Sequence, residues 1–134
     1  MTQTPLELAD KYINNTGTSV FLTGKAGTGK TTFLRHICQT TNKRCVVVAP
    51  TGVAAINANG VTIHSFFQLP FTPFLPSLKN VLSEYSINKQ HVRKEKVEII
   101  RTLDLLIIDE ISMVRADLLD AIDDRLRRYR HSQR

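Results

Sequence analysis

The sequence contains few cysteines and no long apolar run, and both absences narrow the class of protein. Its two cysteines, Cys38 and Cys45, lack the spacing of a metal or redox motif, so we expect free thiols that face the core. No apolar run approaches the roughly 20 residues that cross a bilayer, and the N-terminal residues lack the regions of a signal peptide. We therefore expect a cytoplasmic or nuclear protein without a membrane partner.

Carboxylates are missing between Asp10 and Glu84, while seven lysines and arginines lie in that interval. The whole chain carries a net charge of +6. A stretch of one sign attracts polyanions, either nucleotide phosphates or a nucleic-acid backbone. A solvated positive face without a ligand is the other interpretation that charge alone allows.

The apolar pattern predicts a single α/β domain, which suits 134 residues with 42% hydrophobic and 22% charged residues. The expected strands are continuously apolar rather than alternating, so we predict a parallel sheet with helices on both faces. A capping box, Thr4 with Glu7, starts the first helix. The predicted helices are 4–15, 31–38, 52–58, 63–67, 92–103 and 116–130, and the predicted strands are 19–23, 44–50 and 104–109.

The last predicted helix places its acids early and its arginines late, as the helix dipole prefers. These arginines, at positions 125, 127, 128 and 130, either contact DNA or pair with Asp123 and Asp124. The buried face of this helix is expected to consist of Leu118, Leu119, Ile122, Leu126 and Tyr129.

A phosphate-binding loop is predicted over 24–31, where the chain satisfies the Walker A pattern G-x-x-x-x-G-K-[ST]. The pattern leaves a predicted strand and enters a predicted helix, which is the context that phosphate binding requires. Lys30 would neutralise the β- and γ-phosphates, and the Thr31 hydroxyl would ligate Mg²⁺. The alternative is a glycine-rich turn with a solvated lysine. The expected nucleotide-binding residues are Gly24, Lys25, Ala26, Gly27, Thr28, Gly29, Lys30, Thr31 and Thr32.

The segment 105–110 is an apolar run that ends in two acids, and it predicts a Walker B motif. Asp109 would hold Mg²⁺ through water, and Glu110 would polarise the attacking water as a general base. An Asp-Glu pair after an apolar run can instead cap a helix. Together with the phosphate loop, the pair favours repeated hydrolysis over a switch or a kinase, for which the aspartate alone would suffice.

Three segments together resemble the first RecA-like domain of the Pif (petite integration frequency) family of DNA helicases, superfamily 1B enzymes related to RecD. They are "FLTGKAGTGKTTFL", "APTGVAAINANGVTIHSFF" and "LLIIDEISMV", and the similarity runs from about Val20 to about Arg130. The resemblance implies a P-loop NTPase that uses ATP and Mg²⁺ to move 5′-to-3′ along single-stranded DNA and to unwind duplex junctions. It also implies a nucleoid-associated location in bacteria and a nuclear or mitochondrial one in eukaryotes.

The same resemblance assigns DNA contacts to two segments. Motif Ia, residues 49–55, would grip the DNA backbone, and the next segment would offer a hydroxyl for phosphate and rings for base stacking. The alternatives are that Phe66 and Phe67 belong to the core and that His64 is a half-buried histidine with satisfied hydrogen bonds. The predicted DNA-binding residues are Pro50, Thr51, Gly52, His64, Ser65 and Phe66.

The chain departs from the family pattern in two ways. Family members often read adenine with a glutamine in the first helix, whereas this helix carries Glu7 and has only Gln3 before it. The sequence also stops before the family's "GD" and "QLPP" elements and before a second RecA-like domain. We therefore expect residues 1–134 to form part of an N-terminal RecA-like domain, with a proline-rich loop at 69–76, that binds Mg-ATP with little turnover. A loader or switch acting on a protein partner and a vestigial interaction module are the other hypotheses.

Overall fold

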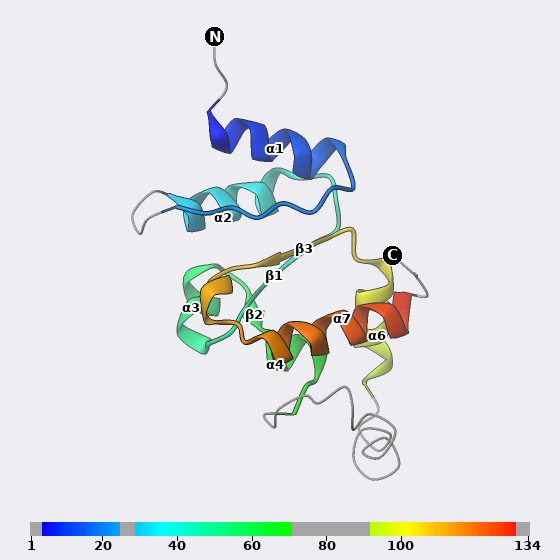
Figure 1. Ribbon diagram of the computed structural model, residues 1–134. Helices are drawn as coiled ribbons and strands as arrows, with labels where there is room; N and C mark the ends of the chain where they lie inside the picture. Colours follow the sequence, from blue (N-terminus) through cyan, green and yellow to red (C-terminus); the bar gives the residue numbers. More distant parts are fainter. Residues whose placement is uncertain (1–3, 25–28, 71–91, 131–134) are drawn as a thin grey trace.

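Three parallel strands form the centre of the computed structural model, which describes residues 4–24, 29–70 and 92–130. They are β1 (Cys45–Ala49), β2 (Val61–Thr62) and β3 (Leu105–Ile108), in the order β2-β1-β3 (Figure 1). Val48 of β1 pairs with Val61 on one side and with Ile108 on the other. Because all three strands run in the same direction, their carboxyl ends meet at one edge of the sheet.

Helices cover both faces of this sheet, as the continuously apolar strands predicted. On one face lie α1 (Pro5–Asn15) and α2 (Lys30–Thr40), and on the other lie α4 (Ile63–Phe67), α6 (Lys94–Thr102) and α7 (Ala116–Arg130). The short α3 (Gly52–Asn57) follows β1, and a 3-10 turn, η3 (Ile111–Met113), follows β3. Among the described residues, no helix has the length and apolar character that a bilayer crossing requires.

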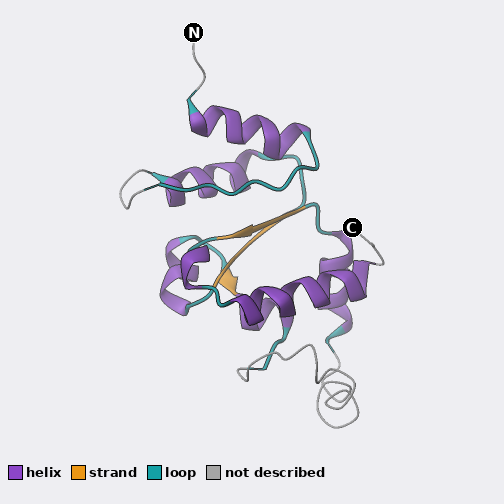
Figure 2. Cartoon of the chain, in the orientation of Figure 1, coloured by secondary structure: helices purple, strands orange, loops and turns teal. Residues whose placement is uncertain are grey.

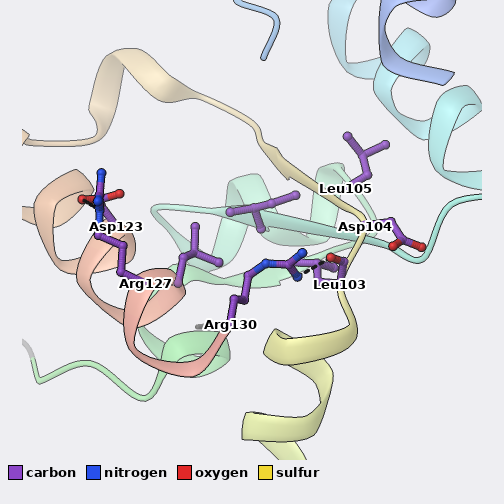
Figure 3. A pocket seen from close by; sticks show the side chains of 8 residues that line it. Leu103, Asp104, Leu105, Asp123, Arg127 and Arg130 are labelled. Atoms are coloured by element: carbon purple, nitrogen blue, oxygen red, sulfur yellow. Dashed lines mark hydrogen bonds and ion pairs between the residues drawn. The ribbon is translucent and has the colours of Figure 1, made fainter. Parts of the chain in front are cut away.

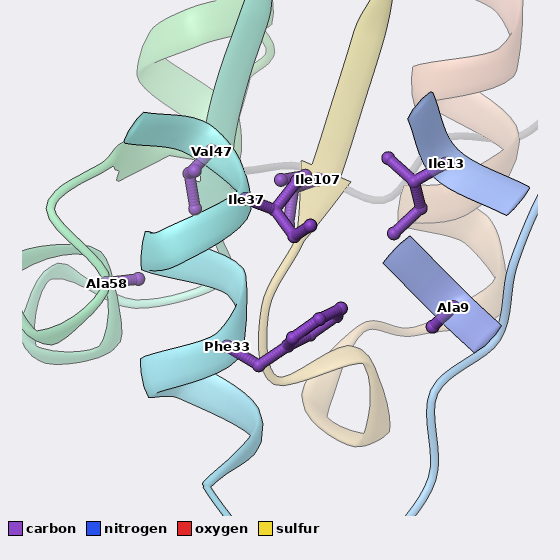
Figure 4. Packing of buried hydrophobic residues seen from close by; sticks show 7 residues of the cluster. All are labelled: Ala9, Ile13, Phe33, Ile37, Val47, Ala58 and Ile107. Atoms are coloured by element: carbon purple, nitrogen blue, oxygen red, sulfur yellow. The ribbon is translucent and has the colours of Figure 1, made fainter. Parts of the chain in front are cut away.

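Alternating residues of β1 and β3 build two separate cores. Val47 and Ile107 point to the first core, which Figure 4 shows between the sheet and helices α1 and α2. Val48 points to the second core, under α4, α6 and α7. The buried members of the first core are Ala9, Ile13, Phe33, Ile37, Val47, Ala58 and Ile107, and those of the second are Val48, Ile63, Phe66, Phe67, Ile100 and Ile122.

The two cysteines are free and pack partly buried against the first core, which confirms the prediction for them. Burial, together with the interaction with the neighbouring Cys38 side chain, raises the pKa of the Cys45 thiol to about 12. A thiol with so high a pKa stays protonated at neutral pH and reacts slowly.

The strand predicted at 19–23 is absent, and Figure 2 shows this segment as a loop. Leu22 packs against the first core, but Phe21 is 74% exposed. An extended segment becomes a strand only when a neighbour satisfies its backbone hydrogen bonds. Within the described ranges, the three-stranded sheet provides no such neighbour for these residues.

The prediction for the buried face of α7 is wrong at one position. Leu119 is 46% exposed, whereas Arg125, which was expected either to contact DNA or to pair with Asp123 and Asp124, is 4% exposed. The Arg125 guanidinium donates to the backbone carbonyl of Gln68 at 3.1 Å. Arg127 pairs with Asp123 at 2.9 Å, as one of the two interpretations proposed.

Gly60 lies between α3 and β2 at a point where two backbones touch. Its amide donates to the Ala55 carbonyl at 2.8 Å, and a Cβ at this position would lie 2.3 Å from the Val47 carbonyl oxygen. That contact is with backbone of the central strand, which cannot move without disturbing the sheet.

We therefore predict that Gly60→Ala lowers the free energy of unfolding by about 1–3 kcal/mol, the usual cost of overpacking. Gly17→Ala is the matched control, because a Cβ at Gly17 meets nothing within 4 Å, and it should change stability by less than about 0.5 kcal/mol. Urea unfolding of both variants measures the difference. Equal stability of Gly60→Ala and the parent chain would show that this contact is not tight in solution.

Candidate nucleotide and DNA site

The carboxyl edge of the sheet gathers the segments that carry the predicted site residues (Figure 1). Residues 50–52 follow β1, residues 64–66 lie in α4 directly after β2, and Asp109 and Glu110 follow β3. Thr31 lies in the first turn of α2. This is the edge where open α/β sheets bind ligands.

Thr31 and Asp109 come together although 78 residues separate them. The Thr31 hydroxyl donates to Asp109 Oδ2 at 3.4 Å. Asp109 is 8% exposed, and its Oδ1 accepts from the Glu110 amide at 2.9 Å, which fixes the plane of the carboxylate. A hydroxyl and a carboxylate are the oxygen ligands that Mg²⁺ takes from proteins beside nucleotide phosphates, so this pair fits the ion.

The start of α2 has the geometry of a phosphate cradle. Gly29 has φ +84°, a left-handed conformation that favours glycine, and no side chain caps the helix at this residue. The Lys30 ammonium donates to the Gly24 carbonyl, so the two described ends of the predicted loop lie close together. Uncapped amides at a helix start bind anions. Lys25, Ala26, Gly27 and Thr28 lie outside the described residues.

Glu110 has a strained backbone. Its φ of 58° and ψ of 46° place an exposed non-glycine residue in the left-handed region. Such a conformation costs an ordinary residue about 1–2 kcal/mol. Strain of this kind occurs at functional sites, where the surrounding structure holds a side chain in position.

The predicted DNA segments present hydroxyl groups at this same edge. The Thr51 hydroxyl oxygen accepts from the Ala54 amide at 3.2 Å and caps α3, which leaves its proton available to a phosphate. Gly52 has nothing within 4 Å of where a Cβ would lie, so a ligand can approach the backbone. Ser65 is exposed, while Pro50 and His64 are half-buried.

The prediction that Phe66 stacks on bases is wrong. Phe66 is 4% exposed and Phe67 is fully buried, with ring centroids 4.8 Å apart in an edge-to-face arrangement. Both rings belong to the second core, because α6 and α7 cover them. The core interpretation therefore holds for both phenylalanines.

Glu7, in the first helix, is occupied by the capping box. Its carboxylate accepts from the Thr4 amide at 3.2 Å, and the Thr4 hydroxyl accepts from the Glu7 amide at the same distance. Gln3 lies outside the described residues.

A cavity of about 230 Å³ lies at the opposite edge of the sheet, near the amino end of β3 (Figure 3). Arg130 donates to the Ile100 carbonyl at 3.0 Å and to the Leu103 carbonyl, closing the end of α6. Hydrogen bonds from the Arg44 amide and side chain lower the pKa of the Asp104 carboxyl. These charged groups hold neighbouring segments of the fold together. The cavity lies at the other end of the strands from the candidate site and is separate from it.

Comparison with known proteins agrees with this arrangement. The model of the PIF1-like helicase family matches residues 5–134. The chain belongs to the PIF1-like helicase family. Among curated relatives, the ATP-dependent DNA helicase Pif1 of Campylobacter jejuni is 36% identical over 112 residues, which cover 81% of this chain and 25% of that protein.

Two crystal structures of Bacteroides Pif1 are similar to this chain, each with 46% identity over 99% of it and 29% of the other chain. The structure bound to single-stranded DNA has a TM-score of 0.82, and the complex with ADP-AlF4 has a TM-score of 0.83. Family membership and the RecA-like α/β fold are thereby confirmed. The chain spans a quarter or less of the length of the curated Pif1 relatives that it matches.

The strain at Glu110 has a measurable consequence. Glu110→Gly removes the Cβ that disfavours the left-handed conformation, so we predict a gain of about 0.5–1 kcal/mol in the free energy of unfolding. Glu110→Gln keeps the Cβ and should leave stability within about 0.5 kcal/mol of the parent. Chemical denaturation distinguishes the two. A Glu110→Gly variant that is less stable than Glu110→Gln would mean that the backbone here is relaxed.

Proposed function

We propose that this chain binds Mg-ATP at the carboxyl edge of its sheet and couples ATP hydrolysis to movement along single-stranded DNA, as part of a 5′-to-3′ DNA helicase. The contact between the Thr31 hydroxyl and the Asp109 carboxylate, at 3.4 Å, carries the proposal. It joins the residues of the Walker A and Walker B patterns into one oxygen-rich site. If the glycines formed only a turn and Asp109 only capped a helix, there would be no reason for the two residues to meet.

Four side chains would have different roles in binding and hydrolysing ATP. Lys30 would neutralise the β- and γ-phosphates, while the amides at the start of α2 would hold their oxygens. Thr31 and Asp109 would hold Mg²⁺, which when bound supplies charge neutralisation for the phosphates. Glu110, exposed beside them, would orient the attacking water and accept its proton.

DNA would lie across the segments that follow β1 and β2. The Thr51 and Ser65 hydroxyls and the open backbone at Gly52 offer donors to phosphates, with Pro50 and His64 beside them. No carboxylate in the sequence between Asp10 and Glu84 opposes the anionic backbone. The complex of Bacteroides Pif1 with single-stranded DNA, at 46% identity, supports this assignment.

The nucleotide site is tested by calorimetry of Mg-ATP binding. Lys30→Ala should weaken the affinity by about 10- to 100-fold, because charge-assisted hydrogen bonds to phosphate are lost. Glu110→Gln should bind nearly as tightly as the parent chain, since this residue is assigned to hydrolysis. Lys11→Ala, which removes an exposed lysine of α1, is the charge-matched control and should bind normally.

The DNA assignment is tested with the same protein and a fluorescent oligothymidine. Binding that weakens steeply with salt is the expected result. Tight Mg-ATP binding without any affinity for oligonucleotides would point to a nucleotide-dependent protein partner instead. Absence of Mg-ATP binding by the folded parent chain would overturn the proposal.

A further inference from the structure

Lys96 reaches from α6 to the segment that follows β2. Its ammonium donates to the backbone carbonyl of Ser65 at 3.0 Å, across 31 residues of sequence. The same nitrogen lies 5.6 Å from the centroid of the Phe66 ring. The Phe66 ring, for which base stacking was one of the two interpretations, therefore makes a cation-π contact with Lys96.

This cation is held in place by a rigid support. Phe66 is 4% exposed and packs edge-to-face on the fully buried Phe67, so the ring cannot turn away from the ammonium. An ammonium over an aromatic face is attracted by the negative face of the ring. With the backbone carbonyl of Ser65 as a second anchor, the Lys96 ammonium is fixed against the backbone of a residue whose side chain is exposed.

The surroundings leave this cation able to bind an anion. An ammonium has three donors, and the Ser65 carbonyl takes one of them. Of the acids on α6, Glu98 pairs with Arg101, and Glu95 is the immediate sequence neighbour of Lys96. Neighbouring residues on a helix do not face each other, so Glu95 points elsewhere.

We propose that Lys96 is a phosphate contact of single-stranded DNA, acting together with the Ser65 hydroxyl on one phosphate group. The proposal rests on the proposed function, because it names a further residue of the same DNA-binding edge. A purely structural role, in which Lys96 only ties α6 to α4, predicts a different response to salt.

The test is the salt dependence of oligothymidine affinity, measured by fluorescence anisotropy. Lys96→Met keeps most of the unbranched apolar part of the side chain and removes its charge, whereas Lys96→Arg keeps the charge. Lys94→Met removes an exposed lysine two positions earlier, which lies on another side of the helix and serves as the matched control. Circular dichroism and thermal unfolding report whether each variant is folded.

We expect Lys96→Met to weaken binding and to reduce the slope of log affinity against log salt by about 0.7, the value for one phosphate contact on a single strand. Lys96→Arg should restore the slope, and Lys94→Met should leave it nearly unchanged. Weaker binding of Lys96→Met with an unchanged slope, or an equal effect of Lys94→Met, would overturn the proposal. A parent chain that binds no oligonucleotide would instead refute the DNA-binding function itself.

Discussion

The hydrogen bond from the Asp109 amide to the Val48 carbonyl, at 2.9 Å, is the constraint on which the candidate site depends. It extends the pairing of β1 and β3 one residue past Ile108, the last residue of the strand. The first acid of the Asp-Glu pair is thus held as part of the sheet, within hydrogen-bond reach of Thr31 in the first turn of α2. A shift of one residue in this register would turn Asp109 to the other face of the sheet.

The two acids then differ because their backbones differ. Asp109 stays buried and receives the amide of the next residue, whereas Glu110 turns into the left-handed region and projects into solvent. The left-handed turn at Glu110 therefore gives the two carboxylates different surroundings. The buried Asp109 is suited to holding an ion, and the exposed Glu110 is suited to orienting a water molecule. The parallel strands bring the DNA segments to this same edge, so that nucleotide and nucleic acid would share one surface of the sheet.

The sequence predicted the features that local signals specify. The capping box of Thr4 and Glu7, the glycine pattern before Lys30 and the apolar run before Asp109 each depend on residues a few positions apart. Features that depend on distant partners were missed. The segment 19–23 is apolar enough for a strand but lacks a pairing partner among the described residues, and the two-residue β2 is too short to show a period. The sequence around Arg125 does not show that this residue is buried. Its burial depends on a hydrogen bond to the Gln68 carbonyl, 57 residues away.

Whether Thr31 and Asp109 act on one Mg²⁺ ion is the central claim, and a double-mutant cycle measures it directly. The affinity for ATP would be determined with Mg²⁺ and with EDTA for Thr31→Ala, Asp109→Asn and the double variant. The two residues are predicted to be coupled, so the double variant should bind Mg-ATP about as weakly as the weaker single variant, with no differences in EDTA. Losses that multiply in the double variant, or that persist in EDTA, would contradict a shared ion.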